Sequence, residues 1–167
     1  MSTQAYIAKQ IGPDQYLSIF CKCNGYLEHL GAFLAGHYDT EARVDELLSV
    51  GDVYALFPKL HPDPSQPHSR KENQKGVTIA YGRDMGDNDY HPKIKTLEEL
   101  DDDEGLVLFG YIFADDQRWK YFHNGQSYEG LRDLKEVLEH IGMNYKQEAQ
   151  ELESPESQPE EAFDMKL

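Results

Sequence analysis

Carboxylates dominate the residues of this sequence that are able to do chemistry. The densest run places six acids in the seven residues from 98 to 104, and a further pair stands at 115–116. Duplex DNA presents one negative charge per roughly 1.7 Å of its axis, so carboxylates at a similar density imitate phosphates and fit a groove lined by Lys and Arg. The alternative is a solvated helix end that keeps the chain in solution. The candidate partner-binding residues are Glu98, Glu99, Asp101, Asp102, Asp103, Glu104, Asp115 and Asp116.

A second candidate site is the segment from Tyr81 to Asp87, which follows an expected strand and contains two glycines. It places the guanidinium of Arg83 next to Asp84 in the sequence. One interpretation is a turn that is locked by an Arg–Asp ion pair, and the other is a loop whose Arg83 binds a phosphate or carboxylate. In the second interpretation, a pocket for a nucleotide or similar anion is formed by Cys21, Tyr26, Arg83 and Asp84.

Standard catalytic and metal-binding motifs are missing from the sequence. It has no G-x4-G-K-[ST], no strand-linked G-x-G-x-x-G and no H-E-x-x-H. Cys21 and Cys23 would give four zinc ligands together with His29 and His37, but their spacing matches no usual zinc knuckle, and two ordinary thiols are favoured. We therefore expect no catalytic residue, no metal and no cofactor, and an enzyme is the less favoured class.

The overall charge favours a basic partner. The 167 residues carry 16 Lys and Arg against 31 Asp and Glu, a formal net charge of −15 at pH 7. Nucleic acids and anionic membranes repel such a chain, so direct binding to either is not expected. No apolar run approaches the roughly 20 residues of a membrane span, and the first residues lack the basic start of a secretory signal. We expect a cytoplasmic protein that binds a basic protein or ribonucleoprotein complex.

Apolar periodicity predicts a single α+β domain over residues 1–146, with an antiparallel sheet of about four to five strands and three to four helices packed mainly on one face. The expected strands are 5–8, 16–21, 77–81, 106–113 and 119–122. The expected helices are 27–34, a helix capped by Thr40, a short turn at 51–56, a short helix with a Thr96–Glu99 capping box, and 131–141.

Two segments do not fit this periodic pattern. Residues 58–76 contain four prolines and form a long loop that is either mobile or a contact surface. Residues 147–167 hold seven acids and one base, and we expect them to be a disordered acidic tail because they have few large apolar groups to bury.

A series of short segments follows a recognisable order. The chain opens with Met-Ser-Thr-Gln-Ala-Tyr-Ile-Ala, has Cys-Lys-Cys-Asn-Gly-Tyr at 21–26, and continues with Gly31, His37-Tyr38, Val44, Leu47, Gly51-Asp52 and Tyr81-Gly82-Arg83-Asp84. Up to about residue 125, this series resembles a widespread set of small, largely uncharacterised bacteriophage and mobile-element proteins. Their usual opening is Met-Ser-Thr-Arg-Ser-x-Ile-Ala, and an early strand ends in Cys-His-Trp-Asp-Gly-Tyr. Here Lys22-Cys23-Asn24 replaces the His-Trp-Asp trio, so no catalytic role is carried over.

The resemblance implies a phage accessory protein that acts in the cytoplasm of an infected bacterium. Small acidic accessory proteins of phages are often inhibitors of host defence, including anti-CRISPR and anti-restriction proteins. Together with the charge, this predicts a non-enzymatic inhibitor that mimics DNA on the basic nucleic-acid-binding surface of a host defence or DNA-processing complex. Two alternatives stay open. One is a protein that sequesters or hydrolyses a nucleotide at the Arg83 loop, and the other is an acidic domain that forms a homodimer through an exposed strand edge.

Overall fold

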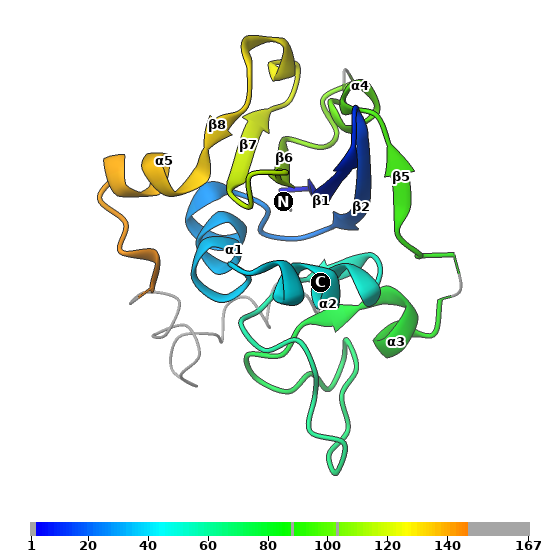
Figure 1. Cartoon of the computed structure of the whole chain (residues 1–167). Helices are drawn as coiled ribbons and strands as arrows, with labels where there is room; N and C mark the ends of the chain where they lie inside the picture. The colour runs from blue at the N-terminus through cyan, green and yellow to red at the C-terminus, as the bar shows by residue number, and fades with distance from the viewer. Residues whose placement is uncertain (1–2, 88, 103, 147–167) are drawn as a thin grey trace.

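The computed structural model describes residues 3–87, 89–102 and 104–146, which form a mixed α+β fold (Figure 1). The strands are β1 (Ala5–Gly12), β2 (Gln15–Cys21), β3 (Val53–Ala55), β4 (Ile79–Ala80), β5 (Lys93–Lys95), β6 (Phe109–Phe113), β7 (Trp119–His123) and β8 (Arg132–Asp133). The helices are α1 (Ala32–His37), α2 (Glu41–Ser49), α3 (Tyr81–Met85), α4 (Leu97–Leu100) and α5 (Leu134–His140), with a π-helical turn at Leu27–Gly31 and a 3-10 turn at Ser127–Glu129.

The strands form one eight-stranded sheet in the order β4-β3-β2-β1-β6-β7-β8, and β5 pairs with β2. The α+β class is confirmed, whereas the expected numbers of strands and helices and the wholly antiparallel pairing are wrong, since the described residues form eight strands and five α-helices. The hairpins β1–β2 and β6–β7 are antiparallel, but β1 pairs with β6 in parallel, and β2 pairs with β3 in parallel. The parallel β1–β6 pair places the turn after β1 and the turn after β6 at the same end of the sheet.

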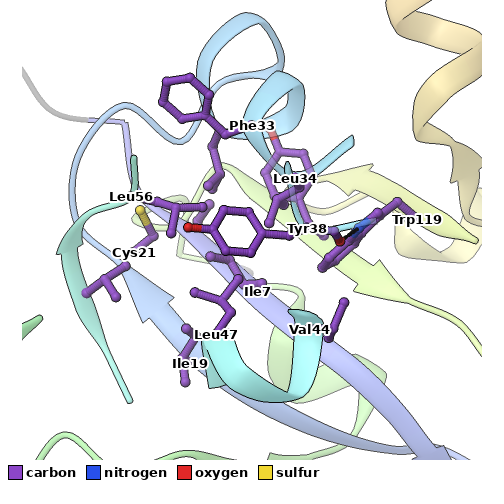
Figure 2. Close-up of a cluster of buried hydrophobic side chains, with 14 of the residues drawn as sticks. Ile7, Ile19, Cys21, Phe33, Leu34, Tyr38, Val44, Leu47, Leu56 and Trp119 are labelled. Atoms are coloured by element: carbon purple, nitrogen blue, oxygen red, sulfur yellow. Dashed lines mark hydrogen bonds between the residues drawn. The ribbon is translucent and has the colours of Figure 1, made fainter. Parts of the chain in front are cut away.

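Alternating side chains give the sheet two buried faces. On the first face, Ile7, Tyr111 and Trp119 pack in one large cluster with residues of α1, α2 and α5. Figure 2 shows Ile7 and Trp119 in this cluster beside side chains of α1 and α2. On the second face, a smaller cluster joins Ile112 and Phe122 to Leu100 of α4. The period-2 alternation of these strands is therefore the signal that fixes which side chains each face buries.

Hydrogen bonds satisfy the large aromatic side chains of the first face. The hydroxyl group of Tyr38 donates to the Phe57 carbonyl oxygen at 2.7 Å, and the indole Nε1 of Trp119 donates to the Tyr38 carbonyl oxygen at 2.7 Å. The Tyr111 hydroxyl donates to the Gly25 carbonyl oxygen at 2.7 Å. Each of these rings is almost fully buried, so an unsatisfied polar atom there would destabilise the fold.

Several local predictions differ from the structure because long-range pairing overrides local pattern. The expected helical turn at 51–56 is strand β3, which pairs with Cys21 of β2. The expected strand 77–81 keeps only Ile79–Ala80, because Tyr81 begins α3. The last helix begins at Leu134, where Asp133 caps the backbone N–H of Glu136. The Thr96–Glu99 capping box is confirmed, and β5 was not predicted.

The long loop 58–76 extends away from the sheet between β3 and β4 (Figure 1). Within it, the Gln74 side chain donates to the carbonyl oxygens of Asp63 and Gln66 at 3.0 and 3.2 Å and accepts from the Asp63 N–H at 2.8 Å. The backbone N–H of Gln74 also donates to Nδ1 of His68 at 3.0 Å. One glutamine therefore ties both branches of the loop together. The expected acidic tail, 147–167, lies outside the described residues.

Candidate functional site

The acidic run at 98–104 does not form one row in the structure. The buried carboxylate of Asp101 accepts from the backbone N–H groups of Gly125 and Ser127, and it thereby fixes the turn after β7. The carboxylate of Asp102 accepts from the N–H groups of Leu106 and Val107, both at 2.8 Å. These two acids hold local structure. Glu104 is exposed beside them, and Asp103 lies outside the described residues.

Glu98 and Glu99, by contrast, are exposed in the first turn of α4. This turn contacts the tip of the β1–β2 hairpin, because the N–H of Leu97 donates to the Asp14 carboxylate at 2.9 Å. Asp14 is exposed, and its backbone has a positive φ of 49° in the hairpin turn. The contact therefore adds a third carboxylate, far away in the sequence, to the two exposed acids of α4.

Asp115 and Asp116 belong to the same end of the molecule. They are exposed in the β6–β7 turn, which lies beside the end of β1 because β1 and β6 are parallel. The N–H of Asp115 donates to the side-chain oxygen of Gln10 at 3.2 Å, and Asp14 and Asp115 both act electrostatically on Tyr16. We call this group of acids from three segments the hairpin-end surface: Asp14, Glu98, Glu99, Asp115 and Asp116.

Hydrogen bonds favour the charged form of two of these carboxylates. At Glu99, hydrogen bonds from the backbone and side chain of Thr96 lower the pKa below its ordinary value. At Asp116, burial acts to raise the pKa, but the hydrogen bonds from Lys120 and from the Arg118 N–H outweigh it and lower the pKa overall. The surface is therefore anionic at neutral pH.

Among the described residues, few basic side chains lie close enough to neutralise the charge of this surface. Lys120 forms an ion pair with Asp116 at 3.1 Å, and Lys95 is near enough to Glu99 to help lower the pKa of its carboxyl group. On the neighbouring helix α2, Glu41 and Asp45 share Lys9 at 3.0 and 2.7 Å. Arg118, whose guanidinium pairs with Asp133, also acts electrostatically on Asp116. The five carboxylates are therefore near two lysines and one arginine that is shared with Asp133, and the hairpin end keeps an excess of negative charge.

The Arg83 loop has a different geometry from a ligand-binding loop. Arg83 forms a bidentate pair with Asp84, with two N···O distances of 2.8 Å. Its remaining contacts are to the carbonyl oxygens of Leu60 at 2.9 Å and Thr78 at 2.8 Å. All three guanidinium nitrogens therefore donate within the chain, which supports the interpretation of a locked turn.

Asp84 is the centre of this locked turn. Its side chain is only 3% exposed and accepts from the Ala80 N–H at 2.8 Å, and His68 Nε2 lies 3.3 Å away. Nδ1 of His68 accepts from Gln74, so the neutral ring carries its proton on Nε2, facing Asp84 and the Thr78 carbonyl oxygen. Burial opposes ionisation of Asp84, but the hydrogen bonds from His68 and Arg83 lower its pKa to about 2.

The other two residues of the proposed anion pocket lie in different surroundings. Cys21 is fully buried, its Sγ donates to the Cys23 carbonyl oxygen at 3.4 Å, and burial raises the pKa of its thiol to about 12. Tyr26 precedes the π-helical turn and is 37% exposed. The structure thus brings Arg83 and Asp84 together, whereas it places Cys21 in the core, where its thiol is protonated and unreactive at neutral pH.

Sequence reasoning missed Asp14, which joins the site through a contact across 83 residues. An Asp in a Gly-Pro-Asp turn looks like ordinary turn chemistry, and only the β1–β6 pairing and the position of α4 bring it beside the other acids. Within the described residues, no group of three or more His, Cys, Asp or Glu side chains is placed to hold a metal ion. None of the helices in that part of the chain is both long and apolar enough to span a membrane.

Comparison of the chain with protein-family models, with curated proteins and with solved structures finds no match. The candidate site is therefore argued from its own geometry and charge.

Proposed function

We propose that this chain is a non-enzymatic binding protein whose hairpin-end surface occupies a Lys/Arg-rich groove of a nucleic-acid-binding protein or ribonucleoprotein complex. The observation that carries the proposal is the convergence of Asp14, Glu98, Glu99, Asp115 and Asp116, which are exposed, on one end of the sheet from three separate segments. This set replaces the contiguous row at 98–104, because Asp101 and Asp102 are used to hold turns.

Backbone hydrogen bonds anchor three of the five carboxylates of this surface. The N–H groups of Leu97, Thr96 and Arg118 donate to Asp14, Glu99 and Asp116 at 2.9, 2.9 and 3.2 Å. Side chains that are already ordered lose less conformational entropy when a partner binds them. The same hydrogen bonds stabilise the local cap and turn, and unlike Asp101 and Asp102 these three side chains are exposed, so their order also serves a partner that binds them.

Electrostatic complementarity sets the expected behaviour of the complex. Opposed charges accelerate association, and salt screens them over a Debye length of about 8 Å at physiological ionic strength. Because the partner groove of this proposal is made for phosphates, we expect nucleic acid to compete for the same groove. The resemblance of the N-terminal segments to phage accessory proteins supports a bacterial defence or DNA-processing complex as the partner and inhibition as the outcome.

The test is capture from a bacterial lysate on the immobilised full-length chain, followed by elution with increasing NaCl or with a short DNA duplex. The variant D14N/E98Q/E99Q/D115N/D116N removes the charges while amide oxygens still accept the hydrogen bonds, and Asn tolerates the positive φ of residue 14. A matched control neutralises five exposed acids elsewhere: Glu28, Glu72, Asp87, Glu136 and Glu139.

The proposal predicts that the parent chain and the control variant capture basic nucleic-acid-binding proteins. Duplex DNA should elute these proteins, and the hairpin-end variant should not capture them. Equal capture by the two variants would show that total charge, rather than this surface, is responsible. Capture that duplex DNA leaves intact would contradict binding to a nucleic-acid groove.

A further inference from the structure

A gap in the sheet leaves a pocket on its second face. Strand β2 pairs on one edge with β5 at Tyr16 to Ser18 and with β3 at Cys21, so Phe20 between them has no strand partner on that side among the described residues. The Asp52 carboxylate takes this place and accepts the Phe20 N–H at 2.8 Å. The resulting pocket has a volume of about 210 Å³.

Two lysines line the pocket from the same side. Lys93 and Lys95 are two residues apart in β5, so their side chains leave the strand on one face, where they lie beside Ser18 and Tyr16 of β2. Within the described residues, no carboxylate forms an ion pair with either ammonium group, although the chain is strongly acidic. Arg43, Arg83, Arg118 and Lys135, in contrast, each have a carboxylate partner.

Aromatic rings and one acid complete the pocket. Tyr6 and Phe20 meet edge to face with their ring centroids 6.1 Å apart, and Lys95 Nζ lies 5.4 Å from the centroid of the Tyr6 ring. The backbone of Asp52 is fixed on both sides, since its N–H donates to Tyr90 and its carbonyl oxygen accepts from Tyr81. Burial raises the pKa of Asp52, which the Phe20 N–H, Lys93 and Lys95 only partly offset.

We propose that this pocket binds the phosphosugar part of a phosphate monoester. Lys93 and Lys95 are the cations for the phosphate, since an ammonium group binds phosphate as a point charge. The Asp52 carboxylate accepts a hydrogen bond from a sugar hydroxyl, and Tyr6 and Phe20 supply the apolar walls. The volume suits a sugar phosphate, and a base attached to it would lie outside.

Calorimetric titration of the full chain with ribose 5-phosphate at physiological salt tests the proposal, with ribose and inorganic phosphate as separate probes. The variant K93Q/K95Q removes both cations, and K71Q/K75Q removes two exposed lysines of the 58–76 loop as the matched control. Circular dichroism and melting temperature verify that both variants fold.

We expect ribose 5-phosphate to bind the parent and the control equally, and the K93Q/K95Q variant at least about tenfold more weakly, with ribose and inorganic phosphate both weaker than the ester. No heat with ribose 5-phosphate, or equal affinity for a folded K93Q/K95Q, overturns the site. Inorganic phosphate that binds as tightly as the ester overturns the sugar assignment. The variant D14N/E98Q/D115N/D116N, which leaves Glu99 near Lys95 unchanged, keeps this binding, so the outcome is independent of the hairpin-end proposal.

Discussion

His29 offers a sharp test of the packing around the first face of the sheet. Its side chain is almost fully buried, with ring centroids 4.5 Å from Phe33 and 6.1 Å from Phe57. Burial lowers the pKa of the imidazole from 6.5 to about 4, although a hydrogen bond with the Leu56 backbone acts in the opposite direction. The folded protein therefore keeps this ring neutral in a pH range where the unfolded chain protonates it.

Proton linkage gives the direction in which the free energy of unfolding changes with pH. Between the unfolded pKa of 6.5 and the folded pKa of about 4, the unfolded chain binds the extra proton, so the free energy of unfolding falls as the pH falls. From RT ln[(1 + 10^(6.5−pH))/(1 + 10^(4−pH))], this single ring removes about 2 kcal/mol of stability between pH 8 and pH 5.

Urea unfolding at pH 8 and pH 5 measures this loss, with the fluorescence of the one Trp, the buried Trp119, as the signal. The non-titrating variant His29→Gln serves as the reference, because the remaining histidines titrate in both proteins and cancel in the difference. The wild type should lose about 2 kcal/mol more than His29→Gln over this interval. An equal loss in the two proteins, or an NMR titration that gives His29 a pKa near 6.5, would refute the packing argument.

Four further substitutions test the structural roles of individual residues by urea unfolding. Asp101→Asn should lower the free energy of unfolding by about 1–2 kcal/mol, because the buried side chain then accepts from only one of the N–H groups of Gly125 and Ser127. Glu98→Gln should change it by less than about 0.5 kcal/mol, and equal effects would contradict the division between structural and surface acids. Asp84→Asn should lower the free energy of unfolding by about 2 kcal/mol at pH 7, because the pKa of Asp84 is about 2 in the folded protein and 3.8 in the unfolded chain. The difference in stability from the wild type should vanish as the pH falls through about 2. A difference that persists in acid would contradict this charge-based account. Gly51→Ala should lower the free energy of unfolding by more than about 1 kcal/mol, because φ is +79° and a Cβ atom would overlap the Tyr90 carbonyl oxygen. An unchanged urea midpoint would contradict this placement of Tyr90.

Local signals predicted much of the fold. The alternation around Ile7, Ile19 and Tyr111 identified core strands, and the Thr40 and Thr96 caps marked the starts of α2 and α4. The pairing of strands was harder, because a parallel β1–β6 pair depends on contacts across about 100 residues that no local pattern encodes. Short strands such as Ile79–Ala80 and Lys93–Lys95 depend on pairing with an adjacent strand, and they are too short to show a periodic pattern in the sequence.

The candidate site shows the same division. Sequence identified Glu98, Glu99, Asp115 and Asp116 as acids that could face a partner, and the structure exposes all four. It did not distinguish them from Asp101, since a buried carboxylate that accepts from two backbone N–H groups looks the same in the sequence as an exposed one. Composition therefore predicts how much charge the chain carries, and tertiary contacts decide which of the charges are available to a partner.

The most direct measurement of the central claim compares salt dependence. Once capture has identified a partner, the dissociation constants of the parent chain and of D14N/E98Q/E99Q/D115N/D116N are measured from 50 to 500 mM NaCl. The hairpin-end account predicts a steep loss of affinity with salt for the parent, and for the variant a weaker complex with a flatter slope. Parallel salt slopes and equal affinities for the two proteins would contradict it.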